Sequence, residues 1–226
     1  MVHIHNCFFL IIRCIAKVKN KFKLYICNNH YNNMKGRPTI HQQEELILKA
    51  QELFWEKGYT ATSLSDLSQV TGAGSGSLYN KFKGGKKELF KKSLQQRRQA
   101  LNAFKDLVAK SDNPIELIKA FFMEQADCDE KTHLKGCIIA NTLVEMTFVD
   151  HELEQQSIQL LKDTENFYTQ TIQAEQHKGT IKSKIPADVL GRYLITFWCG
   201  INSLRRIYPD TQILKQQIAL HLQLIN

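Results

Sequence analysis

The sequence lacks the closely paired cysteines of a zinc site, and the placement of its cysteines also argues against a disulfide framework. Three of the six cysteines fall within residues 1–33, and the others are Cys128, Cys137 and Cys199. They are widely spaced, form no Cys-x-x-Cys pair and have no histidine at ligand spacing along a helix. We therefore expect buried free thiols and no metal centre, with a redox-sensing role for Cys137 as an alternative.

The usual sequence signatures of catalysis are missing as well. The chain has no glycine-rich phosphate loop, no serine elbow and no clustered pair of acidic residues. His133, His151 and His177 are scattered and share no helical face. These absences predict a protein that is not an enzyme and needs no cofactor.

Long hydrophobic runs are also absent. The apolar run from Cys7 to Ile12 is broken by Arg13 and lacks the charged start and the Ala-x-Ala site of a signal peptide. It is far shorter than the ~20 residues that span a bilayer. No other segment resembles a membrane span, so we expect a cytoplasmic protein with no membrane partner. A weak interfacial helix within residues 1–33 stays open as an alternative.

Residues 1–33 differ in composition from the rest of the chain. They have no helical or strand period and are dominated by Asn, Ile, Lys, Phe and Tyr, whose codons are AT-rich. Our hypothesis is that Met34 is the start of the native protein and that residues 1–33 are translated upstream DNA, or else disordered. Peptides from residues 1–33, found by mass spectrometry in the native protein, would refute it.

Outside residues 1–33, which hold five basic and no acidic side chains, positive charge is concentrated in one part of the chain. The formal net charge is +8, and residues 34–93 hold ten basic and six acidic side chains. Residues 94–226 are nearly neutral, with fifteen basic and sixteen acidic side chains. A basic segment of this kind is typical of a nucleic-acid-binding domain. The neutral remainder suits an effector-binding and dimerisation domain.

Residues 63–82, with the sequence SLSDLSQVTGAGSGSLYNKF, carry the most informative pattern. Ser63 with Asp66 three residues later is typical of a helix N-cap, and Gly72 can adopt the positive φ that ends a helix. Between them, apolar side chains recur every third position, as on one face of a helix: Leu64, Leu67 and Val70. This predicts a short helix followed by a tight turn.

A second short helix is predicted directly after that turn. Leu78 and Phe82 recur at four-residue spacing and can pack on the first helix together, which leaves polar side chains on the other faces. By composition alone TGAGSGS could be a flexible linker, but apolar periodicity enters and leaves it in phase. The segment therefore predicts a helix-turn-helix, which presents its second helix to the major groove of DNA.

The preceding segment predicts a helix that completes a three-helix domain. It ends at Gly58, and one helical stripe contains Leu46, Ile47, Ala50, Leu53 and Phe54. Ahead of it lies a short basic arm with Lys35 and Arg37. Such an arm can reach a minor groove or a phosphate, although an ordinary solvated segment explains these residues equally well.

The N-terminal pattern resembles the TetR family of bacterial repressors. The resemblance rests on a helix ending in FWEKGY, then TATSLSDL, then GSLYNKF, then a lysine before ELF, in order over about sixty residues. The segment FKGGKKEL has one more residue before its lysine than many members show, and it is similar to a subgroup with Gly-Gly-Lys there. The resemblance implies a repressor that binds a palindromic double-stranded DNA operator as a homodimer and is released by a small-molecule effector.

The resemblance also implies a role for individual residues. Tyr79, Lys81 and Lys86 would bind DNA phosphates, and Thr62 would contact the DNA backbone. The positions that approach base edges are Ser75, Gly76 and Ser77. Phosphate contacts supply affinity and register and carry no sequence information, and these small side chains have few bidentate donors, so no operator sequence can be inferred.

The rest of the chain reads as helix, so we expect an all-α protein. A helix roughly 35 Å long follows the helix-turn-helix, and Pro114 is placed to start the next one. Another apolar helix follows Gly136, and a long one runs from about Asp150 until Gly179 stops it. We expect a helix-turn-helix DNA-binding domain over residues 34–93, with its motif at 63–82. A helical effector-binding and dimerisation domain is expected over residues 94–226.

The segment that ends the chain bears on assembly. A helix that is apolar on more than one face needs a second partner. The apolar side chains in question are Leu190, Tyr193, Leu194, Phe197, Trp198, Ile201 and Leu204. In the resembling family the last two helices pair with their copies in a four-helix dimer interface, and we adopt that expectation.

The effector pocket is predicted from the resemblance and from apolar content. Asn141 and Glu145 lie four residues apart on an apolar helix, and Cys137 belongs to a Gly-Cys segment that helps to line the cavity in similar proteins. The predicted apolar walls are Phe121, Phe122, Phe167 and Trp198. Ordinary core packing of the aromatic side chains and a capped or exposed Glu145 remain alternatives. A helical interaction protein that has lost specific DNA binding is the alternative function.

Overall fold

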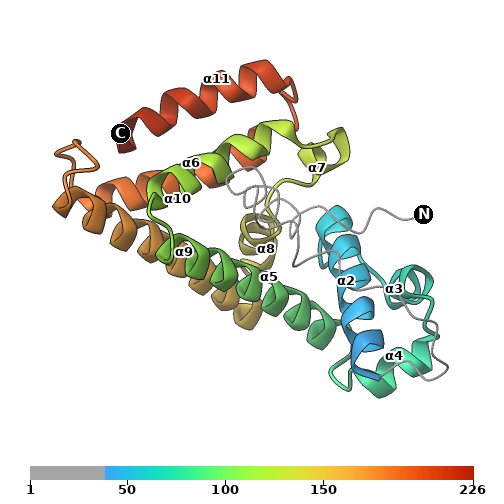
Figure 1. The fold of residues 1–226 in the computed structure, drawn as a ribbon. Helices are drawn as coiled ribbons and strands as arrows, with labels where there is room; N and C mark the ends of the chain where they lie inside the picture. Colours follow the sequence, from blue (N-terminus) through green and yellow to red (C-terminus); the bar gives the residue numbers. More distant parts are fainter. Residues whose placement is uncertain (1–38) are drawn as a thin grey trace, which may run out of the picture. The chain divides into compact units, whose positions relative to one another are not determined.

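The computed structural model describes residues 39–226, with side chains from residue 43 onward. No strand occurs in this part of the chain, which confirms the predicted all-α class. The predictions for residues 1–33 and for Arg37 lie outside the described residues. The helices are α2 (Thr39–Lys57), α3 (Leu64–Thr71), α4 (Ser75–Lys81), α5 (Gly85–Ala109), α6 (Pro114–Met123), η1 (Glu124–Asp127), α7 (Glu130–Lys135), α8 (Ile138–Met146), α9 (His151–His177), α10 (Ala187–Leu204), α11 (Thr211–Leu222) and η2 (Gln223–Ile225) (Figure 1).

The described residues form two compact units. The reader unit consists of residues 39–99 together with Cys137–Leu160, and the C-terminal unit consists of Ala100–Gly136 together with Leu161–Asn226. Helices α5 and α9 each run from one unit into the other. The sequence prediction divides the chain at residue 93 instead, and does not place α8 and the start of α9 with the helix-turn-helix.

The reader unit is built on the apolar stripe of α2. All five predicted stripe residues are buried, and Phe54 meets Phe90 of α5 edge to face, with ring centroids 4.8 Å apart. Leu78 and Phe82 are buried as predicted. The helix ends at Gly58, whose φ of 83° is the left-handed conformation that glycine adopts without steric strain. The first three helices of the unit follow one another as predicted (Figure 1).

One part of the predicted pattern in α3 is wrong. Leu67 is fully buried, but Leu64 is 48% exposed and Val70 is 38% exposed. Residues three apart on an α-helix are displaced by about 60° around its axis, so the two steps from Leu64 to Val70 cover a wide arc of about 120°. A short helix with one contact face buries only the middle residue of that arc.

Stacked aromatic side chains fill the core of the C-terminal unit. Phe122 is fully buried and stacks on Phe197 with ring centroids 5.6 Å apart, and Phe121 stacks on Trp198 at 5.0 Å. Helix α11 lies against α6 (Figure 1). Pro114 starts α6, and Gly179, with φ of 76°, follows the end of α9, both as predicted.

The apolar side chains predicted to form a wide surface on α10 are partly buried and partly exposed in the structure. Leu190, Leu194, Phe197 and Ile201 are buried within the C-terminal unit, whereas Leu204 is 49% exposed. The exposed apolar side chains of this region come from both ends of α10, from the segment between α10 and α11, and from α11: Val189, Leu204, Ile207, Tyr208, Ile213 and Leu220. None of the helices in residues 39–226 is long and apolar enough to cross a membrane.

Candidate nucleic-acid interface

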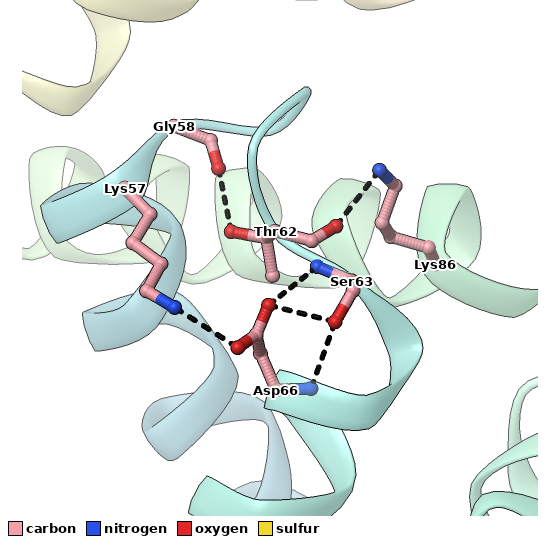
Figure 2. Close-up of polar contacts among 6 residues, drawn as sticks. All are labelled: Lys57, Gly58, Thr62, Ser63, Asp66 and Lys86. Carbon is pink, nitrogen blue, oxygen red and sulfur yellow. Dashed lines mark hydrogen bonds and ion pairs between the residues drawn. The ribbon is translucent and has the colours of Figure 1, made fainter.

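A capping box fixes the start of α3, as the sequence predicts. The Asp66 backbone N–H donates to Ser63 Oγ at 3.0 Å, and the Asp66 carboxylate accepts from the Ser63 backbone N–H at 2.8 Å. Figure 2 shows this pair together with Lys57, whose Nζ lies 2.9 Å from Asp66 Oδ1. The box satisfies helix-end donors that would otherwise lack partners. Hydrogen bonding from the Ser63 backbone N–H, and then from Lys57, holds the pKa of Asp66 well below its ordinary value.

This shift predicts a pH-dependent contribution of Asp66 to stability. Because the folded-state pKa is lowered, the stabilisation is complete above the ordinary pKa of about 3.8 and is lost as the pH falls towards the folded value. We expect Asp66→Asn to lower the urea-unfolding free energy at pH 7, and the gap to the unsubstituted protein to close below about pH 4. Asp112→Asn, an exposed loop change, should show no such trend. A gap that stays constant between pH 3 and pH 7 would contradict the assignment.

The turn between α3 and α4 is held by local hydrogen bonds. Gly72 has φ of 70°, and its backbone N–H donates to the Ser68 carbonyl at 3.0 Å. The Ser68 hydroxyl donates to the Ala73 carbonyl at 2.8 Å, and the Thr71 hydroxyl donates to the Leu67 carbonyl at 2.6 Å. The glycine-rich segment is therefore an ordered turn.

Helix α4 presents a polar face to solvent. Leu78 and the following Phe82 anchor it, while the residues predicted to approach DNA stand on the outside: Ser75, Gly76, Ser77 and Tyr79. Tyr79 is 60% exposed, so its hydroxyl is free to reach a phosphate. Lys81 is half-buried. The structure adds two exposed residues on this side that the sequence prediction missed, Asn80 and Lys83.

Lys83 lies just beyond the end of α4. Its Nζ lies 5.9 Å from the centroid of the Tyr79 ring and 3.4 Å from Asn80 Oδ1. Because the C-cap Phe82 has non-helical dihedral angles, helical spacing does not predict this position, and it is the turn after α4 that returns Lys83 to the exposed face. The charge of Lys83 therefore lies beside the predicted phosphate contact.

Two predicted DNA contacts have their polar groups engaged inside the reader unit. Thr62 is 1% exposed, and its hydroxyl donates to the Gly58 carbonyl at 2.6 Å. Lys86 Nζ donates to the Tyr59 carbonyl at 3.0 Å and to the Thr62 carbonyl at 2.9 Å (Figure 2). The ammonium also lies 4.4 Å from the centroid of the Tyr59 ring. Lys86 thus fastens the α2–α3 loop to α5.

The residues predicted to form the effector pocket fall into both units. The four aromatic residues belong to the C-terminal unit, where Phe122 and Phe167 are core residues and Phe121 and Trp198 are partly buried against them. Cys137, Asn141 and Glu145 belong to the reader unit. The C-terminal unit also contains an open cavity of about 570 Å³ lined by Phe167 and by charged side chains that include Lys105, Asp163, Glu175 and Lys178.

Comparison with known proteins places both halves of this architecture in one family. Residues 46–92 match the family described as bacterial regulatory proteins, tetR family, and residues 114–220 match the tetracyclin repressor-like C-terminal domain. The chain belongs to the tetR family. The two matches together cover more than half of it, and the first contains the complete helix-turn-helix.

Several TetR-family relatives extend the comparison. The chain is 33% identical over 110 residues to the transcriptional repressor ComR of Escherichia coli, which covers 47% of this chain and about half, 52%, of ComR. It is 24% identical over 180 residues to the repressor DhaR of a Mycobacterium species, covering 77% of this chain and 87% of DhaR.

Solved structures share the fold at low sequence identity. A TetR regulator from Chloroflexus aurantiacus has a TM-score of 0.70 at 21% identity, covering 81% of this chain and 93% of that one. A cysteine mutant of the TetR-family regulator CifR, solved with a 26-bp operator DNA, has a TM-score of 0.67 at 16% identity, covering 87% of this chain and all of CifR. These similarities support the fold.

Proposed function

We propose that this protein is a sequence-specific DNA-binding transcriptional regulator. The observation that carries the proposal is the arrangement of α4, which is anchored by Leu78 and Phe82 and presents Ser75, Ser77 and Tyr79 to solvent behind an ordered turn. A helix held in this way can enter the major groove, with the tyrosine and nearby lysines on the phosphates. The function proposed is binding, with no catalytic step.

We propose further that the regulator is a repressor released by a small-molecule effector. The family membership and the repressor names of ComR and DhaR support this. The effector would bind in the C-terminal unit, by the aromatic side chains predicted from the sequence or in the cavity beside Phe167. An effector that favours a DNA-incompetent arrangement of two readers would release the operator by shifting the population. This function is exercised in the cytoplasm, where the operator lies.

The proposed assembly is a homodimer. Exposed apolar side chains at both ends of α10 and on α11, such as Leu204, Ile213 and Leu220, provide surface that a second copy would cover. Ile213 and Leu220 lie seven residues apart and therefore on one face of α11. Two readers related by a two-fold axis match the two half-sites of a palindromic operator.

DNA titration tests the proposed function directly. The full chain is titrated against the DNA upstream of its own gene and against random-sequence DNA, at several salt concentrations. We expect Tyr79→Phe to weaken specific binding by roughly tenfold, because one hydrogen bond to a charged phosphate is lost. Tyr208→Phe, which removes an exposed hydroxyl from the C-terminal unit, is the matched control.

The salt dependence gives a second measure of the same interface. Each phosphate contact contributes about −0.9 to the slope of log affinity against log salt, so Lys83→Ala should make the slope shallower by about one contact.

If the upstream DNA is bound no better than random DNA, an operator is selected from a pool of random oligonucleotides. If no sequence in that pool is preferred, the proposed function is wrong.

A further inference from the structure

The last turn of α8 carries a glutamate whose carboxylate is bound by the backbone of the reader loop. Glu145 Oε2 accepts the Tyr59 N–H at 2.9 Å, and Oε1 accepts the Thr60 N–H at 2.6 Å. A Cβ on Gly58 would come within 3.0 Å of both carboxylate oxygens, so the carboxylate also lies close against the Gly58 backbone. Hydrogen bonds that involve an ionised acceptor are about twice as strong as neutral ones.

Lys86 holds the same loop by donating hydrogen bonds to its carbonyl oxygens, whereas Glu145 accepts hydrogen bonds from its N–H groups. Lys86 binds the carbonyl oxygens of Tyr59 and Thr62, while Glu145 binds the N–H groups of Tyr59 and Thr60. Tyr59 therefore has its N–H on an anion and its carbonyl on a cation. A loop residue fixed from both sides can move only if one of the two charged contacts breaks.

The position of this loop determines where α3 begins. Thr62 is followed directly by Ser63, the N-cap of α3, and α3 leads through the Gly72 turn into α4. No helix lies between α2 and the cap, and the turn within the loop is closed by Thr62, whose N–H donates to the Tyr59 carbonyl at 3.3 Å and whose hydroxyl donates to the Gly58 carbonyl at 2.6 Å. A displacement of Tyr59 and Thr60 would therefore displace the cap and with it the helix-turn-helix.

The opposite end of α8 follows a residue that is fixed in the C-terminal unit. Gly136 has φ of 67°, and a Cβ there would come within 2.7 Å of the Asn202 carbonyl oxygen of α10. The Gly136 carbonyl also accepts from Arg205 Nη2 at 3.4 Å. Helix α8 has nine residues and is therefore about 13 Å long. It begins two residues after Gly136, beyond its extended N-cap Cys137, and runs to its last turn, where Glu145 lies.

We propose that Glu145 is the positioning residue through which α8 sets the α2–α3 loop and thereby the DNA reader. The inference rests on the proposed function, because it identifies Glu145 as a contact through which a conformational change in the C-terminal unit would reach the DNA-binding helices. A change that moves Gly136 is carried along α8, and the carboxylate of Glu145 transmits it to the backbone of Tyr59 and Thr60. Because both oxygens of Glu145 bind this loop, its role here differs from the pocket role expected from the sequence.

Amide hydrogen exchange in DNA-free protein is the first test. We expect exchange of the Tyr59 and Thr60 amides to accelerate on the order of tenfold in Glu145→Ala and less in Glu145→Gln, which keeps one acceptor oxygen. Exchange in the core of α5 should be unchanged, which separates a local effect from unfolding. Glu154→Gln removes the same charge elsewhere in the reader unit and is the control. Unchanged exchange at both amides in Glu145→Ala overturns the proposal.

The second test measures how strongly the protein prefers one spacing between the two operator half-sites. If Glu145 contributed only to stability, this preference would not change in its variants. A selected operator is altered by one or two base pairs between its half-sites, and binding is measured for the full chain and for Glu145→Gln. Because the readers are less firmly placed in the variant, we expect its preference for the best spacing to fall by roughly tenfold. Glu154→Gln should keep the preference of the unsubstituted protein.

The outcomes of the two tests distinguish this inference from the function on which it rests. If the unsubstituted protein prefers no DNA sequence, the proposed function is refuted, and so is the proposed role of Glu145 in positioning the DNA-binding helices. Specific binding with the same spacing preference in Glu145→Gln and Glu145→Ala refutes the inference alone. Faster exchange at Tyr59 and Thr60 together with a relaxed spacing preference supports both.

Discussion

Replacing Gly191 by alanine is expected to destabilise the protein by about 3 kcal/mol, although alanine is the better helix former. Gly191 is buried in α10, where an added Cβ would come within 2.1 Å of Thr169 Oγ1 of α9. It would also stand 3.0 Å from the Thr169 backbone nitrogen and 3.1 Å from the Glu165 carbonyl oxygen. The threonine side chain can rotate away, but the backbone atoms can yield only if α9 and α10 separate. Urea unfolding followed by circular dichroism measures the loss.

The same helix offers a matched control of opposite sign. A Cβ on Gly200 would have no neighbour within 4 Å in the single chain, so Gly200→Ala should gain up to about 1 kcal/mol from helix propensity alone. Equal stability of Gly191→Ala and Gly200→Ala would contradict the close approach of α9 and α10. A loss in Gly200→Ala that depends on protein concentration would instead place Gly200 in the dimer interface.

Local rules were sufficient to predict the helix-turn-helix. The Ser63–Asp66 capping box, the positive φ of Gly72 and the burial of Leu78 and Phe82 each involve residues a few positions apart. Interactions of that range are encoded by the residue types and their spacing, so periodicity and capping rules identify them. The helix starts and stops at Pro114 and Gly179 were predictable for the same reason.

Contacts between distant segments were not predictable from these rules. The partners of Glu145 are 85 and 86 residues away, and Lys86 binds carbonyl oxygens 24 and 27 residues away. A charged side chain on an otherwise apolar helix indicates only that it needs a partner. The sequence therefore favoured a pocket for Glu145 and a phosphate for Lys86, whereas the fold supplies backbone groups for both.

The arrangement of Thr62 and Lys86 changes how substitutions in the reader should be interpreted. Lys86→Ala would remove two loop hydrogen bonds as well as any phosphate contact, so a loss of DNA affinity could not be assigned to the phosphate alone. Tyr79 and Lys83 are exposed, and the contacts described above join them only to each other and to the neighbouring Asn80. Their variants therefore report on DNA contacts more directly.

A buried arginine at the end of α10 holds the loop-rich part of the C-terminal unit together. Arg205 is 2% exposed, and its guanidinium donates to groups of η1, of α7 and of Gly136. The acceptors are neutral: the Gln125 carbonyl and side-chain oxygens, Cys128 Sγ, and the carbonyls of Thr132 and Gly136. These contacts are 3.2–3.5 Å long, so each is weak and their effect lies in their number.

Arg205→Met is expected to cost about 3 kcal/mol, because it keeps most of the buried volume but removes all of the hydrogen bonds that the guanidinium donates. For a chain of this size the melting temperature should fall by on the order of 10 °C. Arg206→Met makes the same chemical change one position later, at an exposed side chain, and should alter stability by no more than about 0.5 kcal/mol. If the two variants melt together, the guanidinium of Arg205 does not organise this region. A large loss in Arg205→Met alone shows that η1, α7 and Gly136 depend on one buried side chain.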